Sequence, residues 1–184
     1  MTARINIHAI SYGSRVNGPG ERTVLHFQGC TLGCKGCINP GTWANNGGKT
    51  YSVETLLELI LSTKSDGLTI SGGEPFQQAS GLFALLSKYK EAEPNKTVVV
   101  FTGYYLGELL ERVSLYDYPI DLLVSGRYEM DKRYELQEAP PLLSSTNQKL
   151  ILLTEEITID DLIGLPRIEW DIDSNGDVIT RGLP

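Results

Sequence analysis

The sequence predicts an α/β fold with a mainly parallel sheet and a C-terminal β-hairpin. Short β-branched and aromatic runs alternate with stretches of helical periodicity along most of the chain. Near the end, Asn175-Gly176 separates two strand-like runs, which is a strong signal for a hairpin turn. With 184 residues and a hydrophobic content of 41%, the chain can bury one sizeable core. We therefore expect a single domain over residues 1–184.

The first third of the chain is expected to hold two strands and a helix. Residues 5–12 alternate apolar and polar side chains, as a half-buried strand does. Residues 23–28 form a β-branched and aromatic strand that stops at Gly29. The loop between them, residues 16–20, is either a plain turn or a segment that lies against a cofactor. Ser52 is a plausible N-cap, and the apolar residues after it recur at helical spacing: Val53, Leu56, Leu57, Ile60 and Leu61.

The rest of the chain repeats this alternation. Further strands are expected at residues 67–71, 97–102, 120–125, 149–153, 167–172 and 177–180, and helices at 82–89, 106–113 and, capped by Thr158, 159–163. Residues 39–48 look irregular. Residues 127–148 lack a clear period and are long for a plain connection, which suggests a binding loop or lid.

Several predicted strands end at glycines, namely Gly29, Gly72-Gly73, Gly103 and Gly126. Ligands of parallel α/β folds gather outside the carboxyl ends of the strands. Right-handed crossovers would bring these ends to one edge of the sheet. The sequence therefore predicts a single site at this edge.

Composition excludes some classes of partner. Acidic residues outnumber basic ones, 23 against 16, and the net charge is -7, which argues against general affinity for nucleic acid. No apolar run approaches the roughly 18 residues of a membrane span. Residues 1–12 also lack the apolar core of a signal peptide. We expect a cytoplasmic protein in a reducing compartment, with no nucleic-acid or membrane partner.

All three cysteines of the chain, Cys30, Cys34 and Cys37, lie within eight residues. A C-x3-C-x2-C loop can turn three sulfurs toward one centre, and Gly33 and Gly36 let the backbone come close because they lack a Cβ. The spacing suits three corners of a 4Fe-4S cluster, which in ordinary ferredoxins takes four thiolates. One iron would remain open to a substrate.

Three other uses of the cysteines are weaker. A zinc site needs a fourth ligand, and His26 is expected to be packed or at an edge rather than coordinating. A redox pair of Cys34 and Cys37 leaves Cys30 unexplained. A disulfide leaves an odd thiol in a compartment that we expect to be reducing.

The motifs resemble those of the radical S-adenosylmethionine superfamily. They are the cysteine loop after one strand, Ser71-Gly72-Gly73-Glu74-Pro75 after a second, and Phe101-Thr102-Gly103-Tyr104 after a third. Within that superfamily the chain is similar to the activating enzymes of anaerobic ribonucleoside-triphosphate reductase. This similarity extends to residues 16–20, 37–43 and 144–148 and covers most of residues 10–153. The cysteine loop and the Gly-Gly-Glu turn are highly specific together.

The resemblance implies a partial (β/α) barrel with a 4Fe-4S cluster on Cys30, Cys34 and Cys37, and S-adenosylmethionine on the fourth iron. It implies that the turn at Gly72-Gly73-Glu74 meets the methionyl ammonium and that Thr102 and Gly103 lie near the ribose or the carboxylate. The full set of cofactor-binding candidates is Gly36, Asn39, Ser71, Gly72, Gly73, Glu74, Thr102, Gly103, Ser125, Asn147 and Gln148. No catalytic side chain is identified beyond these.

The implied chemistry is a one-electron cleavage of S-adenosylmethionine to methionine and a 5'-deoxyadenosyl radical. That radical takes a hydrogen atom from a glycine Cα of a large glycyl radical enzyme partner. An electron donor such as flavodoxin or ferredoxin is implied as well. Arg127 and Tyr128 could border the path toward the partner's glycine loop.

Three features depart from the family pattern. Gly36 stands where an aromatic residue often precedes the third cysteine, and Ser125-Gly126 stands where activating enzymes commonly have Asp-Gly. The chain from about Thr154 extends beyond the matched region. The reductase-activating group tolerates glycine before the third cysteine, so Gly36 sharpens the resemblance to that group. Ser125 and the unmatched C-terminal part keep open a radical enzyme acting on another peptide or small molecule. A non-catalytic iron-sulfur carrier is a third hypothesis, from a different functional class.

Overall fold

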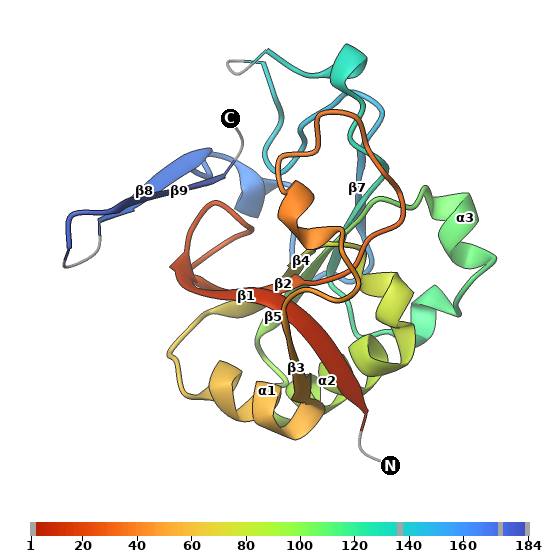
Figure 1. The fold of residues 1–184 in the computed structure, drawn as a ribbon, viewed down its shortest axis with the longest axis vertical. Coiled ribbons are helices and arrows are strands. Elements are labelled where there is room, and N and C mark those ends of the chain that lie inside the picture. The colour runs from red at the N-terminus through yellow and green to blue at the C-terminus, as the bar shows by residue number, and fades with distance from the viewer. Residues whose placement is uncertain (1–2, 136–137, 173–174, 183–184) are drawn as a thin grey trace.

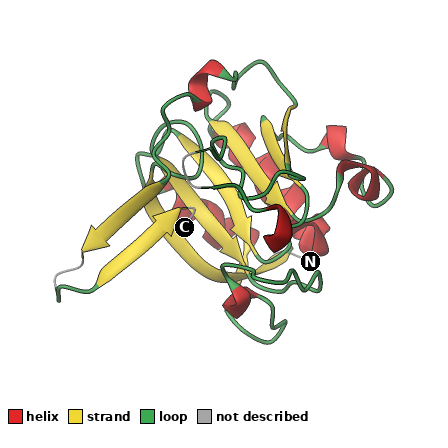
Figure 2. Ribbon diagram, turned by 90° about the horizontal axis from the view of Figure 1, so that it is seen from above, coloured by secondary structure: helices red, strands yellow, loops and turns green. Residues whose placement is uncertain are grey.

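A computed structural model describes residues 3–135, 138–172 and 175–182. Within them, seven strands form one sheet in the order β3-β1-β2-β4-β5-β6-β7, and two form a separate hairpin (Figures 1 and 2). The strands are β1 (Arg4–Ser14), β2 (Arg22–Phe27), β3 (Lys49–Ser52), β4 (Gly67–Gly72), β5 (Thr97–Thr102), β6 (Leu122–Ser125), β7 (Lys149–Leu152), β8 (Ile168–Ile172) and β9 (Val178–Gly182). The α-helices are α1 (Val53–Leu61), α2 (Ala79–Ala92) and α3 (Leu106–Leu110).

The fold is mixed α/β, and the prediction of a mainly parallel sheet holds only for its centre. Strands β2, β4, β5 and β6 are parallel neighbours. In contrast, β1 is antiparallel to β2 and β3, and β7 is antiparallel to β6. A parallel return needs a crossover, usually through a helix, and the β1–β2 and β6–β7 connections contain no α-helix in their described residues. The predicted hairpin is present as β8–β9.

Most predicted elements match those observed, with three differences. Strand β3 was not predicted, because its four residues gain strand geometry only by pairing with Arg4–Ile7 of β1. Helix α3 ends at Leu110 rather than 113, because the chain bends there to bury Leu115. The helix expected at 159–163 is a single 3-10 turn at Asp160–Leu162, followed by Gly164 and Pro166, which stop regular structure.

The two faces of the sheet are covered differently. Helices α1 and α2 pack on one face through residues such as Leu56 and Leu85, which are fully buried. On the other face, Val99 and Leu122 are covered by Leu142 and by other residues of the connecting segments. Residues 127–148, predicted to be a binding loop or lid, therefore help to close this second face. Among the described helices, none combines the length and hydrophobicity that a membrane-spanning segment needs.

A buried arginine fixes the amino ends of the central strands. The Arg22 guanidinium is fully buried and donates to the carbonyls of Pro19, Leu68 and Thr97 and to the hydroxyls of Thr69 and Thr97, at 2.7–2.9 Å. Burial lowers the pKa of Arg22 to about 10, so the group stays charged at neutral pH. Pro19 thus lies at the amino ends of β4 and β5, whereas Val16 and Asn17 of the same loop line a cavity together with Cys37, Ser71 and Gly72.

Candidate functional site

The cysteine loop leaves the carboxyl end of β2. Cys30, Cys34 and Cys37 are free thiols of intermediate exposure. The Cys37 N–H donates to the Cys34 carbonyl at 3.1 Å. The tight loop depends on Gly33 and Gly36, whose φ angles of +63° and +77° lie in the left-handed region that favours glycine.

The thiols sit in a partly desolvated setting. Burial raises the pKa of Cys30, and burial together with the neighbouring Cys37 raises the pKa of Cys34. The thiolate is the form that binds a metal, so binding an iron-sulfur cluster here must release protons.

The glycine turn after β4 packs directly on the backbone that leads into the cysteine loop. The Gly73 N–H donates to the Phe27 carbonyl at 2.8 Å, and the Glu74 N–H donates to the Gly29 carbonyl at 2.9 Å. A Cβ on Gly73 would lie 2.3 Å from the Gly29 oxygen, and a Cβ on Gly72 would lie 2.4 Å from the Phe27 nitrogen. Both glycines are therefore required for this close approach.

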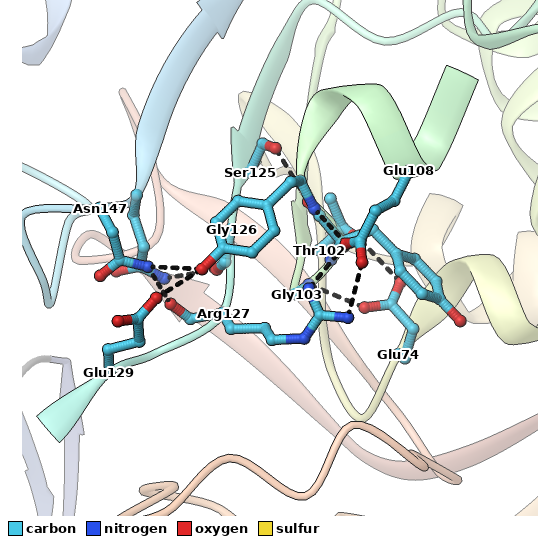
Figure 3. A network of polar contacts seen from close by, with 12 residues as sticks. Glu74, Thr102, Gly103, Glu108, Ser125, Gly126, Arg127, Glu129 and Asn147 are labelled. Atoms are coloured by element: carbon cyan, nitrogen blue, oxygen red, sulfur yellow. Dashed lines mark hydrogen bonds and ion pairs between the residues drawn. The ribbon is translucent and has the colours of Figure 1, made fainter. Parts of the chain in front are cut away.

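Glu74 joins the tip of β4 to the tip of β5 (Figure 3). Its carboxylate is fully buried and accepts hydrogen bonds from Thr102 Oγ1 at 2.8 Å, Gly103 N at 2.7 Å and Phe76 N at 3.1 Å. Burial raises the pKa of Glu74 to about 7, against the opposing effect of these donors. Glu74 thus accepts hydrogen bonds from two other predicted site residues, Thr102 and Gly103.

The tip of β6 is held by the segment that leads into β7. Ser125 Oγ donates to the Tyr104 carbonyl at 2.9 Å. Gln148 Nε2 donates to the Gly126 carbonyl at 3.1 Å, and Asn147 Nδ2 donates to the Arg127 carbonyl at 2.7 Å. Asn147 Oδ1 is buried and has no hydrogen-bond partner among the described residues.

The strand tips and the cysteine loop enclose one pocket, which we call the cysteine pocket. Ten of the fourteen predicted site residues line it: Cys30, Cys34, Cys37, Ser71, Gly72, Gly73, Glu74, Thr102, Gly103 and Gln148. The other four lie around it. Gly36 lines a neighbouring pocket under Met130 and Tyr128, Asn39 borders the cavity beside the hairpin, and Ser125 and Asn147 make the backbone contacts just described.

A comparison with protein-family models gives one match that spans most of this architecture. Residues 16–151 match the family described as a 4Fe-4S single cluster domain. This range includes the cysteine loop and every strand tip of the pocket. The chain belongs to this family. It is a radical S-adenosylmethionine enzyme of the glycyl radical activating group.

Curated relatives of this radical S-adenosylmethionine enzyme carry matching names. The anaerobic ribonucleoside-triphosphate reductase-activating protein of Vibrio cholerae is 38% identical over 121 residues, which are 61% of this chain and 77% of that protein. The protein of the same name from Escherichia coli K12 is 32% identical over 136 residues, 69% of this chain and 87% of its own. The pyruvate formate-lyase-activating enzyme of Clostridium pasteurianum is 40% identical over 118 residues, but this chain spans only 49% of it.

Among solved structures, the crystal structure of QueE from Escherichia coli aligns with 54% of this chain and 52% of its own. The TM-score is 0.44 and the sequence identity is 20%.

The cofactors of this family are a 4Fe-4S cluster and S-adenosylmethionine, and the donor set fits them. Three thiols line one pocket with glycine backbone. In the described part of the chain, no three His, Cys, Asp or Glu side chains are drawn together as a site for a single metal ion. In a 4Fe-4S cluster the thiolates bind different irons, so they can lie farther apart than the ligands of a single zinc ion.

The sequence did not reveal an ion pair at Arg127, which lies in the chain between Gly126 and Tyr128, two residues that line the pocket. Arg127 donates to Glu108 at 2.6 and 3.0 Å (Figure 3). The guanidinium also lies over the Tyr105 ring, at 5.2 Å from its centroid. The Glu108 carboxylate also accepts from the Tyr105 N–H at 2.9 Å. Glu108 is separated from Arg127 by nearly twenty residues and by β6, so no local pattern could reveal the pairing. The sequence predicts Arg127 only as a possible border of the path toward the partner's glycine loop.

Proposed function

We propose that this radical S-adenosylmethionine enzyme generates a glycyl radical on an anaerobic ribonucleoside-triphosphate reductase. The similarity to activating proteins of that name, which extends over 87% of the Escherichia coli protein, supports the proposal. The cysteine pocket supports it as well, since it combines three thiols with a glycine turn in one cavity. An electron donor such as flavodoxin or ferredoxin is part of the proposal.

In this proposal Cys30, Cys34 and Cys37 hold the cluster as thiolates. When bound, the cluster supplies one electron for cleavage of the sulfonium of S-adenosylmethionine, which yields a hydrogen-abstracting radical. The turn at Gly72-Gly73 offers backbone carbonyls to the methionyl ammonium, a group with donors and no acceptor.

Glu74 acts mainly as a positioning residue in this scheme. Its two oxygens are engaged by Thr102, Gly103 and Phe76, which leaves the turn's backbone to face the ligand. Gln148 and Asn147 hold the carbonyls of Gly126 and Arg127, so they set the position of the β6 tip. Asn147 Oδ1 remains as a buried acceptor for a ligand donor.

We also propose that the open sheet is the wall of a partial (β/α) barrel and that residues 1–184 form one radical S-adenosylmethionine domain. The parallel strands β2, β4, β5 and β6 with their tips at one edge support this architecture. In the described residues β3 and β7 stand at opposite edges of the sheet.

The test is anaerobic reconstitution with iron and sulfide, followed by reduction in the presence of S-adenosylmethionine. We expect 5'-deoxyadenosine and methionine as products and, once a candidate reductase is added, a glycyl radical signal in electron paramagnetic resonance. Cys34→Ser is the matched control and should abolish both signals. A reconstituted cluster without cleavage of S-adenosylmethionine would instead support an iron-sulfur carrier.

A radical enzyme with another substrate is the second candidate. It is favoured by Ser125 in place of the commoner Asp and by the C-terminal hairpin, which lies outside the matched residues 16–151. Cleavage of S-adenosylmethionine without a glycyl radical on the reductase would favour this reading.

A further inference from the structure

A large opening lies beside the C-terminal hairpin, next to the cysteine pocket. It is a cavity of about 600 Å³ between the hairpin β8–β9 and the second face of the sheet, opposite helices α1 and α2. Strands β1, β2, β4 and β5 contribute one side, and Ile168, Ile179, Thr180 and Arg181 of the hairpin contribute the other. We call this cavity the hairpin groove. Its volume is within the range of ligand-binding clefts.

The hairpin groove adjoins the cysteine pocket. Cys37, Ser71, Gly72, Phe101 and Gln148 line both cavities. A molecule in the groove therefore lies against residues at the carboxyl ends of β4 and β5. The hydrogen donor of a radical enzyme has to reach this point, because a bound radical cannot act over a distance.

The hairpin is fixed to the sheet at its base. The Glu169 carboxylate accepts from Ser14 Oγ at 2.7 Å and from the Arg15 N–H at 2.9 Å, and it lies 3.8 Å from Arg181. Ser14 is fully buried at the end of β1 and accepts in turn from Asn17 Nδ2 at 2.9 Å. The groove wall is thus held in place by contacts between residues more than 150 positions apart.

One face of the hairpin is apolar and exposed. Ile168, Trp170 and Ile172 alternate along β8 and share this face with their partners on β9, Gly182, Thr180 and Val178. Trp170 is 66% exposed, Ile172 71% and Val178 59%. We call Trp170, Ile172 and Val178 the apolar stripe. It begins where Ile168 and Thr180 line the groove and continues outward along the hairpin, which projects from the body (Figure 2).

Such a surface indicates a protein partner rather than a small molecule. Contiguous exposed apolar side chains mark interaction sites, and tryptophan is prominent among residues that dominate binding energy. Strand β9 pairs only with β8, and β1 beyond Ile7 pairs only with β2 among the described strands. No other described strand occupies these two edges, and extended peptide segments can join strand edges.

We propose that the hairpin groove receives an extended segment of the partner protein that carries the target glycine, and that the apolar stripe binds the body of that partner. This inference rests on the proposed function, and it assigns a role to a C-terminal hairpin that lies outside the family match. The groove binds the segment so that its glycine lies at the strand tips, and the apolar stripe provides specificity for the partner protein.

The test uses the reconstituted full-length enzyme with a candidate reductase. Trp170→Ser removes the centre of the stripe, and Thr180→Arg fills the mouth of the groove. We expect Trp170→Ser to weaken reductase binding by about tenfold or more. For both variants the ratio of glycyl radical to 5'-deoxyadenosine should fall. Tyr116→Ser, at an aromatic side chain that is 79% exposed on the α3–β6 connection, is the matched control and should keep the wild-type values.

The outcomes separate the two proposals. If the wild-type enzyme forms the glycyl radical and both variants match it in binding and ratio, the groove inference is overturned and the proposed function stands. Wild-type protein that cleaves S-adenosylmethionine but leaves the reductase without a radical overturns the proposed function. Should Trp170→Ser change only self-association of the enzyme, the stripe binds a second copy and the inference is wrong.

Discussion

At the scale of single residues, the site depends on groups whose role is set by what they touch. Gly72 and Gly73 are needed because the backbone of Phe27 and Gly29 occupies the space of a side chain. Glu74 is fully buried, and three donors offset the cost of removing its carboxylate from water. The Gly-Gly-Glu motif therefore positions the strand tips in addition to any direct contact with a cofactor.

Gly73→Ala should separate the cysteine loop from β4. The new Cβ would lie 2.3 Å from the Gly29 oxygen, a distance that the backbone can relieve only by moving. We expect a lower iron content after reconstitution and a loss of roughly 1–3 kcal/mol in the free energy of unfolding, measured by urea denaturation.

Gly107→Ala is the control for this variant. Apart from its chain neighbours and the nearby backbone of helix α3, no heavy atom lies within 4 Å of its Cβ position, so alanine should be neutral or stabilise by about 0.5–1 kcal/mol. Equal iron content and stability in Gly73→Ala and the wild type would contradict the packing argument.

At the scale of elements, helix α1 is stabilised by the hydrogen bond that caps its N-terminus. Ser52 closes β3 and caps α1, accepting a hydrogen bond from the Thr55 N–H at 3.1 Å. The buried face of α1, with Val53, Leu56 and Ile60, then packs on the sheet. The cap is one of the local features that the sequence predicted correctly.

Ser52→Ala should destabilise the protein by about 1 kcal/mol, because the N–H groups of the first turn lose their acceptor. Thermal and urea unfolding measure this loss. Ser52→Thr keeps a hydroxyl in a β-branched residue that suits the strand, so it should retain most of the stability. If alanine and threonine behave alike, the cap contributes nothing.

At the scale of the whole molecule, His26 connects the sheet to the hairpin groove. Its Nε2 lies 3.2 Å from Ser11 Oγ of β1, and it lines the groove together with Arg181. Burial lowers the pKa of His26 to about 4, and the charges of His8 and Arg181 act in the same direction. His26 is therefore neutral in the folded protein at physiological pH.

This shift predicts a pH dependence of stability. Between pH 6.5 and about 4 the unfolded chain binds a proton at His26 that the folded protein excludes. Stability should therefore fall as the pH drops through this window and should be flat with respect to this group above it.

His26→Gln keeps a polar partner for Ser11 without titrating. Its urea midpoint relative to that of the wild type should rise as the pH falls from 6.5 toward 4. A constant difference across this window would show that His26 does not contribute to the pH dependence.

The local chemistry was predictable from the sequence. A few neighbouring residues encode each of these features: the cysteine spacing, the glycine turn, the strand runs and the capped helix. This is so because metal ligation by nearby thiols, backbone angles and capping hydrogen bonds depend on residues close in sequence. These features identified the family and placed ten candidate residues around one pocket.

What only the tertiary structure decided are the contacts between distant segments. Such contacts set the direction of β7 and create strand β3. They also form the ion pair of Arg127 with Glu108 and the hairpin groove. Sequence periodicity reports which face of an element is apolar, but it does not report which other element will cover that face. The site's residues were therefore set by local pattern, whereas the route by which a partner reaches them was set by packing.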